Sequence, residues 1–278
     1  MDAKGRLDIA AYRRALGHRT ALVSIMWANN ETGTLFPVAE LAEMAREAGA
    51  LFHTDAVHAA GKIAIDLKST KIDMLSLSGH KFHGPKGIGV LYVRKGVKFS
   101  PLIRGGRQER GRRGGTENVP AVVGLGKAAE LAGLRLDEDT ARVKVLRDRF
   151  EACVLARIED SAVQGDVENR LPGTSNIAFD GAEGEAILLH LNQAGIAASS
   201  GSACASGAME PSHVLRAMNV PYTAAHGAIR FSFSRENTQG DVDRVLNALP
   251  GIVAKARAVS PFAGRRHADL PSSYWLSA

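Results

Sequence analysis

A cysteine in unusual surroundings is the first feature that suggests chemistry. Cys204 lies in the run Ser199-Ser-Gly-Ser-Ala-Cys-Ala-Ser-Gly207, where small and hydroxyl-bearing residues offer no apolar pocket for the sulfur. A structural cysteine usually packs as a small hydrophobe, whereas a thiol on an open loop can ionise and react as a thiolate. Taken alone, such a segment is more often an ordinary loop, so its interpretation depends on the rest of the chain.

A lysine and an aspartate form the second feature. Lys81 follows an apolar run, behind Ser-Gly-His and ahead of a Gly-Pro turn, and Asp55 ends the apolar run that begins at Leu51. A lysine in a partly enclosed site can form a Schiff base with an aldehyde, although most loop lysines are only solvated. Pyridoxal phosphate needs a lysine for its aldehyde and a carboxylate for its protonated ring nitrogen. Asp55 by itself would also suit a helix cap.

The elements that position these residues alternate between strand and helix in the first half. The expected strands cover 21–27, 51–55, 74–78 and 88–93, and an expected helix covers 37–48. This order predicts a largely parallel sheet with helices on both faces, and such sheets bind ligands beyond the carboxyl ends of their strands. Three polar groups would then lie along one edge: Asn29 with Asn30, Asp55, and residues 78–81.

The second half predicts a smaller domain. Long helices are expected over 119–136 and 138–157, followed by strands at 176–179 and 229–232 and helices at 185–194 and 212–218. A last helix would begin near Gly240, and Pro250 is expected to kink or end it. The predicted fold is α/β, with a large domain over 1–137 and a small α+β domain over 138–278 that carries the Cys204 loop. Cys153, in an apolar helical context, is expected in the core.

Composition excludes several classes of protein. The two cysteines lie in dissimilar contexts, do not form a disulfide framework and favour a reducing cytoplasm. The start has no apolar leader segment, and no apolar run is long enough to span a membrane. The net charge is +6, and five arginines lie in 104–116 without interleaved aromatic residues. The run therefore does not support stacking on single-stranded nucleic acid, and a small phosphorylated ligand or an acidic partner explains it as well. Neither a nucleic-acid nor a membrane partner is expected.

Six segments, in order, resemble the NifS/IscS cysteine desulfurases, a class V branch of the fold-type I pyridoxal-phosphate enzymes. They are residues 24–33, 53–57, 78–81, 110–116, 199–204 and 229–232. The resemblance runs from about Met1 to Arg235, and the segments around Trp27 and Cys204 are most similar to the nitrogen-fixation branch. It implies a cytoplasmic homodimer that takes sulfur from L-cysteine and passes it to an iron–sulfur scaffold protein.

The resemblance also implies a role for each matching residue. The implied cofactor contacts are Lys81 as the Schiff-base lysine, Asp55 on the pyridinium nitrogen, Asn30 near the phenolic oxygen, Ser78 and His80 on the phosphate, and Thr116 on a phosphate across the subunit boundary. Asn30 and Arg230 would bind the substrate carboxylate. Cys204 would attack the substrate sulfur, retain it as a persulfide and leave alanine. Through persulfide delivery, Cys204 is also the candidate ligand for iron or an iron–sulfur cluster.

Two departures from the family pattern leave alternatives open. His58 stands where the family has a glutamine on the cofactor's phenolic oxygen; a neutral imidazole can donate one hydrogen bond there, or simply neighbour the ring. The family also begins with roughly a hundred more residues, enough to complete the sheet of a domain. They carry a Gly-Ala-Thr-Glu phosphate turn and a ring-stacking histidine. The chain is therefore expected to be N-terminally incomplete and weakly active or inactive alone. A selenocysteine lyase, a class V aminotransferase and a non-catalytic fragment remain as alternatives.

Overall fold

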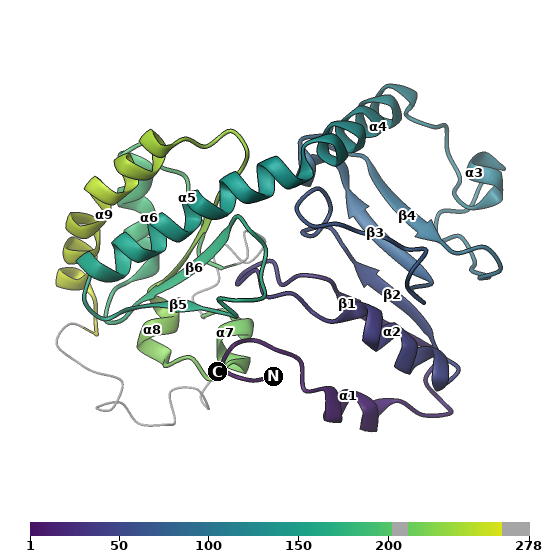
Figure 1. Ribbon diagram of the computed structural model, residues 1–278, viewed down its shortest axis with the longest axis horizontal. Helices are drawn as coiled ribbons and strands as arrows, with labels where there is room; N and C mark the ends of the chain where they lie inside the picture. Colours follow the sequence, from purple (N-terminus) through teal and green to yellow (C-terminus); the bar gives the residue numbers. More distant parts are fainter. Residues whose placement is uncertain (202–210, 263–278) are drawn as a thin grey trace. The chain divides into compact units, whose positions relative to one another are not determined.

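The computed structural model describes residues 1–201 and 211–262 (Figure 1). The chain divides into two compact units. Unit 1 comprises Met1–Ala10, Ala28–Phe36 and the described residues from Asp137 onward, and unit 2 comprises Ala11–Trp27 and Pro37–Leu136. Two short N-terminal stretches therefore belong with the second half of the chain. Within the described residues, no helix is long and apolar enough to cross a membrane.

A four-stranded sheet forms the centre of unit 2. Its strands are β1 (Leu22–Met26), β2 (Leu51–Asp55), β3 (Met74–Ser78) and β4 (Gly89–Val93), in that order across the sheet. The first three are parallel, and β4 runs antiparallel to β3. The four predicted strands are confirmed. The reversal of β4 follows from its short connection, because only residues 79–88 separate it from β3 and a parallel crossover needs a dozen residues or more.

Helices of unit 2 fix the sheet and the turn after β3. The amphipathic helix α2 (Val38–Glu47) packs against β2 and β1, and Gly49, at φ +77°, ends it in the left-handed conformation that glycine adopts without strain. Helix α4 (Val119–Leu134) packs on the one-turn helix η1 (Gly79–Phe82). The short helix α3 (Gln108–Gly111) lies within unit 2, and most of α1 (Ile9–Ala15) belongs to it as well.

Unit 1 is a three-stranded antiparallel sheet with helices on both faces (Figure 1). Its strands are β5 (Ser161–Gln164), β6 (Thr174–Phe179) and β7 (Ala228–Ser232). The apolar residues of α5 (Leu136–Arg157), α6 (Gly184–Gln193) and α9 (Gln239–Val259) form one core with Ile177 and Ile229. The short helices α7 (His213–Ala217) and α8 (Tyr222–His226) cover the opposite face, around Ala178.

Pro250 is expected from the sequence to kink or end helix α9, and the second alternative is wrong, because the helix continues through Pro250 to Val259. A proline inside a helix removes the hydrogen bond to the carbonyl four residues earlier. That carbonyl belongs to Leu246, and Arg157 Nη1 on α5 donates to it at 3.5 Å. A capping box between Thr238 and Asp241 fixes the start of the helix. The helix therefore continues past the proline with its first turn capped and with a side chain from α5 next to the carbonyl of Leu246.

Candidate active site

Asp55 ends β2 at the carboxyl edge of the unit 2 sheet. Its strand is in register with both neighbours, Met26 of β1 and Ser76 of β3 lying opposite Asp55. The side chain is exposed, and Oδ1 accepts a hydrogen bond from the Val57 backbone N–H at 2.8 Å. This bond orients the carboxylate along the turn after β2. The arrangement leaves a negative charge at the strand end where a parallel sheet binds its ligands.

Lys81 lies on η1, directly after β3, at the same edge of the sheet. The Gly79 N–H donates to the Ile88 carbonyl and the Gly84 N–H donates to the Gly79 carbonyl, both at 2.9 Å, which closes the turn. Phe82 anchors it by packing with Leu125 of α4. Lys81 itself is half-buried on this rigid turn. The expectation that Asp55 and Lys81 follow neighbouring strands at one edge agrees with the register of β2 and β3.

The other expected cofactor residues of unit 2 lie on three different segments. Ser78, half-buried, is the last residue of β3, and His80, exposed, belongs to η1. His58 is half-buried in the turn after β2, and its carbonyl accepts a hydrogen bond from Lys62 Nζ at 3.1 Å. Thr116 is exposed beyond a glycine pair, where Arg113 Nη1 donates to its carbonyl at 3.4 Å.

A row of polar side chains crosses the sheet beside Asp55, and sequence reasoning missed it. The His53 ring bridges two hydroxyls, with Nδ1 2.7 Å from Ser24 Oγ and Nε2 2.8 Å from Ser76 Oγ. Burial lowers the pKa of the His53 imidazole, while the charge of Asp55 acts in the opposite direction. The neutral ring donates through one nitrogen and accepts through the other. His53 and Asp55 are two positions apart on β2, so their side chains lie on the same face of the sheet, and this spacing is the sequence signal that could have revealed the polar row.

Unit 1 brings together the two residues predicted to bind the substrate carboxylate. Arg230 lies on β7, and its backbone pairs with Ser199 through two hydrogen bonds of 2.7 and 3.1 Å. Its Nη1 donates to the carbonyl of Asn30 at 2.6 Å. These residues are 200 positions apart in sequence. The guanidinium is thereby fixed from two sides, with its backbone in the sheet and one nitrogen on the 29–34 loop.

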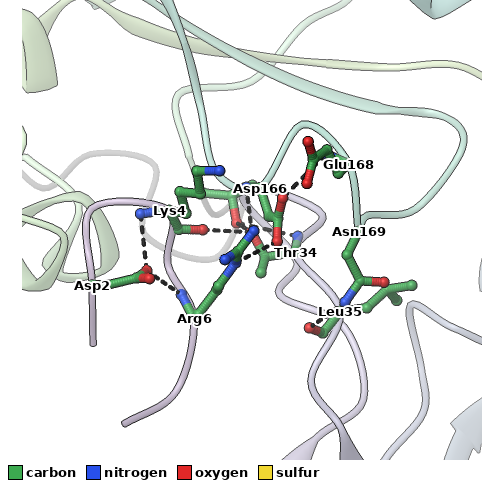
Figure 2. A network of polar contacts seen from close by, with 9 residues as sticks. Asp2, Lys4, Arg6, Thr34, Leu35, Asp166, Glu168 and Asn169 are labelled. Atoms are coloured by element: carbon green, nitrogen blue, oxygen red, sulfur yellow. Dashed lines mark hydrogen bonds and ion pairs between the residues drawn. The ribbon is translucent and has the colours of Figure 1, made fainter.

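The 29–34 loop is itself held by a network of polar contacts (Figure 2). Asp166, whose side chain is 1% exposed, accepts from Arg6 Nε at 2.6 Å, and Thr34 Oγ1 donates to the Lys4 carbonyl at 3.2 Å and accepts from the Asp166 N–H at 3.0 Å. The hydrogen bond from Arg6 holds the pKa of the Asp166 carboxyl below its usual range. The loop that carries Asn30 is therefore anchored to the first residues of the chain and to the loop after β5.

Cys204 lies outside the described residues, and its assignment as the nucleophile stays a prediction from the sequence. Cys153, on α5, is half-buried and packs against the core of unit 1. Among the described residues, no group of three or more His, Cys, Asp or Glu side chains could hold a metal ion.

Comparison with known proteins identifies the family. The family model of class V aminotransferases matches residues 1–245, and the chain belongs to this family. It is 71% identical to a cysteine desulfurase of Gluconacetobacter diazotrophicus, over 94% of this chain and 66% of that protein. It is 59% identical to the cysteine desulfurase NifS of Azotobacter vinelandii, over 94% of this chain and 65% of that protein.

A solved structure described as a NifS-like protein is also similar to the chain. It superimposes with a TM-score of 0.84 at 36% identity, over 92% of this chain and 67% of that one. The chain thus spans about two thirds of the length of the relatives it matches. The expected resemblance to NifS-type cysteine desulfurases and the expected fold-type I architecture are confirmed.

The residues at the edge of the unit 2 sheet fit pyridoxal 5′-phosphate, the cofactor of this family. The Asp55 carboxylate is exposed, and Oδ2 has no hydrogen-bond partner among the described residues, so it can accept from a pyridinium N–H. Lys81 lies on the turn after the neighbouring strand, where its amine could react with the aldehyde. Ser78 and His80, on the same segment, have side chains that could donate hydrogen bonds to a phosphate.

Proposed function

We propose that this protein is a pyridoxal-phosphate-dependent cysteine desulfurase that converts L-cysteine to L-alanine. The observation that carries the proposal is the placement of Asp55 and Lys81 after neighbouring strands at one edge of the sheet. The names and high identity of the relatives support the same activity. When bound, the cofactor withdraws electrons from the substrate's α-carbon and so makes bonds around it labile.

Each of the predicted site residues has a definite task in this proposal. Arg230 binds the substrate carboxylate together with Asn30, and the bond between them orients the guanidinium. Asp55 holds a proton at the ring nitrogen, and Lys81 holds the cofactor and moves protons at the substrate carbon. Ser78, His80 and Thr116 bind the phosphate, and His58 donates to the phenolic oxygen.

Sulfur transfer in this proposal belongs to Cys204. Its thiolate attacks the sulfur of the bound substrate, so that the carbon–sulfur bond of cysteine breaks and a sulfur–sulfur bond forms on Cys204. The net change is cysteine plus a thiol giving alanine plus a persulfide, which requires no external oxidant. The persulfide then passes to an acceptor, which we propose to be an iron–sulfur scaffold protein. The name of the Azotobacter relative supports a role in nitrogen fixation.

The proposal is tested by alanine formation from L-cysteine in the native-length protein reconstituted with pyridoxal phosphate. Lys81→Ala should abolish alanine formation, whereas Lys86→Ala, an exposed lysine on the same loop, should retain it. Selenocysteine should be offered in parallel, and 2-oxo acids assayed, because a selenocysteine lyase or an aminotransferase would give products only there. Absence of alanine from cysteine in a cofactor-loaded protein would refute the proposal. Sedimentation of the same sample tests the expected homodimer.

A further inference from the structure

Glu31 is a buried carboxylate that the proposed chemistry does not use. Glu31 is 2% exposed, and both its backbone N–H and its carbonyl are hydrogen-bonded. The N–H donates to Asn29 Oδ1 at 2.9 Å, and the carbonyl accepts from Asn176 Nδ2 at 3.3 Å. Burying a carboxylate is costly unless it is hydrogen-bonded. The group that bonds its side chain therefore indicates what Glu31 does.

Ser212 is that group, and it lies at the start of α7. Its Oγ accepts from the N–H groups of Val214 and Leu215 at 3.1 and 3.4 Å, which caps the helix. The same Oγ lies 2.5 Å from Glu31 Oε2. A hydroxyl carries a single proton. Because both N–H groups donate to Ser212, its own proton points to Glu31, and the carboxylate is the acceptor.

Gly201 lies close to the same carboxylate. It is buried with φ +62°, and a Cβ placed on it would lie 2.8 Å from Glu31 Oε2 and 3.6 Å from the Ser212 Cβ. Any side chain would therefore collide with the carboxylate as well as strain the backbone. Two residues before it, Ser199 is paired with the backbone of Arg230. Gly201 and Ser212 thus meet at Glu31, beside the strand that carries the substrate-binding arginine.

We propose that Glu31 is a positioning residue that holds Gly201 and Ser212 together and fixes them relative to Arg230 and Asn30. In sequence, Gly201 and Ser212 flank the segment with Cys204, so this inference rests on the proposed function. Glu31 directly follows Asn30, whose carbonyl accepts from Arg230. One short stretch of chain thereby contains both Asn30, the partner of Arg230, and Glu31, which contacts Ser212 and lies against Gly201. Catalysis by a positioned nucleophile is sensitive to displacements of about 1 Å.

The test compares variants of the native-length, cofactor-loaded protein. Glu31→Ala and Ser212→Ala should each lower kcat for alanine formation by about tenfold or more, while KM for L-cysteine changes by less than about threefold because Arg230 is untouched. Glu31→Gln keeps an acceptor oxygen for Ser212 and should restore most of the rate. The double variant Glu31→Ala/Ser212→Ala should be no slower than the slower single variant, because both remove the same bond.

Thr238→Ala is the matched control, because it removes the N-cap hydroxyl of α9, which has no bond to Glu31 among the described residues. It should keep kcat within about twofold of the parent. Multiplicative losses in the double variant, a rise in KM in place of a fall in kcat, or an equal loss in Thr238→Ala would each overturn the proposal. If Glu31→Ala does not fold, Ser212→Ala compared with Ser212→Thr, which keeps the hydroxyl, gives the same decision.

A second measurement separates this inference from the proposed activity. Hydrogen exchange at the Val214 and Leu215 amides should accelerate in Glu31→Ala, because Ser212 then loses the partner that orients its hydroxyl. This result is expected whether or not the protein turns over cysteine. Unchanged exchange would refute the positioning role alone, whereas an inactive parent protein with accelerated exchange in the variant would refute only the proposed function.

Discussion

Substitution of Arg230 by lysine tests the substrate-binding half of the site most directly. The arginine presents two terminal nitrogens, and Nη1 is engaged by the Asn30 carbonyl at 2.6 Å. A lysine has one compact ammonium group, so it cannot donate to that carbonyl and at the same time bind a carboxylate through two parallel hydrogen bonds. It therefore loses at least one hydrogen bond to a charged group, about 1.5–3 kcal/mol. At about 1.4 kcal/mol per factor of ten, KM for L-cysteine should rise about 10- to 150-fold.

Steady-state alanine formation as a function of L-cysteine concentration measures this effect, and the visible absorption of the bound cofactor checks that loading is unchanged. Arg235→Lys is the control, because this arginine is paired only with the exposed Glu236 among the described residues. Its KM should stay near that of the parent. A KM for Arg230→Lys within about twofold of the parent, or an equal rise in the control, would show that Arg230 does not bind the carboxylate.

Three further predictions concern the nucleophile and the stability of unit 1. Cys204→Ala should abolish persulfide formation and leave the cofactor spectrum intact, whereas Cys153→Ala, on the packed face of α5, should remain active; persulfide mapped to Cys153 by mass spectrometry would contradict this. Glu151→Ala leaves Arg170 buried without its two 2.6 Å hydrogen bonds and should cost about 3–5 kcal/mol in urea unfolding, against at most about 1 kcal/mol for Glu43→Ala in the exposed pair with Arg46. Arg6 lowers the pKa of Asp166, so the stability that this pair contributes is fully present above the pKa of an aspartate in the unfolded chain, about 3.9. It is lost as the pH falls through the lower pKa of the folded state. Asp166→Asn should therefore reduce the dependence of the unfolding free energy on pH in this acidic range, and an unchanged dependence would disprove the linkage.

Local patterns in the sequence were sufficient to predict most of the secondary structure. The apolar runs of β1 to β4 and the amphipathic period of α2 are local patterns, which indicate a strand or a helix without reference to the rest of the chain. Strand β5 escaped prediction because Ser161–Gln164 is short and has little apolar character. Helix α9 passes Pro250, where a side chain from α5 contacts the carbonyl that the proline leaves without its helical hydrogen bond, and no local pattern can reveal this contact.

The candidate site, too, could be predicted only in part from the sequence. Asp55 and Lys81 could be placed from strand ends, since parallel neighbours bring their carboxyl ends to one edge. The bond between Arg230 and Asn30 and the meeting of Glu31 with Ser212 join residues about 200 and 181 positions apart. Such contacts depend on tertiary packing, and no spacing in the sequence predicts them. The resemblance to the family named Arg230 and Asn30, but it did not indicate how each orients the other.

The division of the chain into interleaved units has a consequence for biosynthesis. Residues Ala28–Phe36 belong to unit 1 but are synthesised more than a hundred residues before Asn176, which binds the Glu31 carbonyl. Because the chain is synthesised from its N-terminus, the contacts of this stretch with β6 and β7 cannot form until those strands have been translated. Unit 1 therefore cannot be obtained as a self-sufficient fragment by cutting at residue 137. A recombinant piece that starts there would need the 28–36 peptide supplied in trans, and its dependence on that peptide would report directly on assembly of the substrate-binding loop.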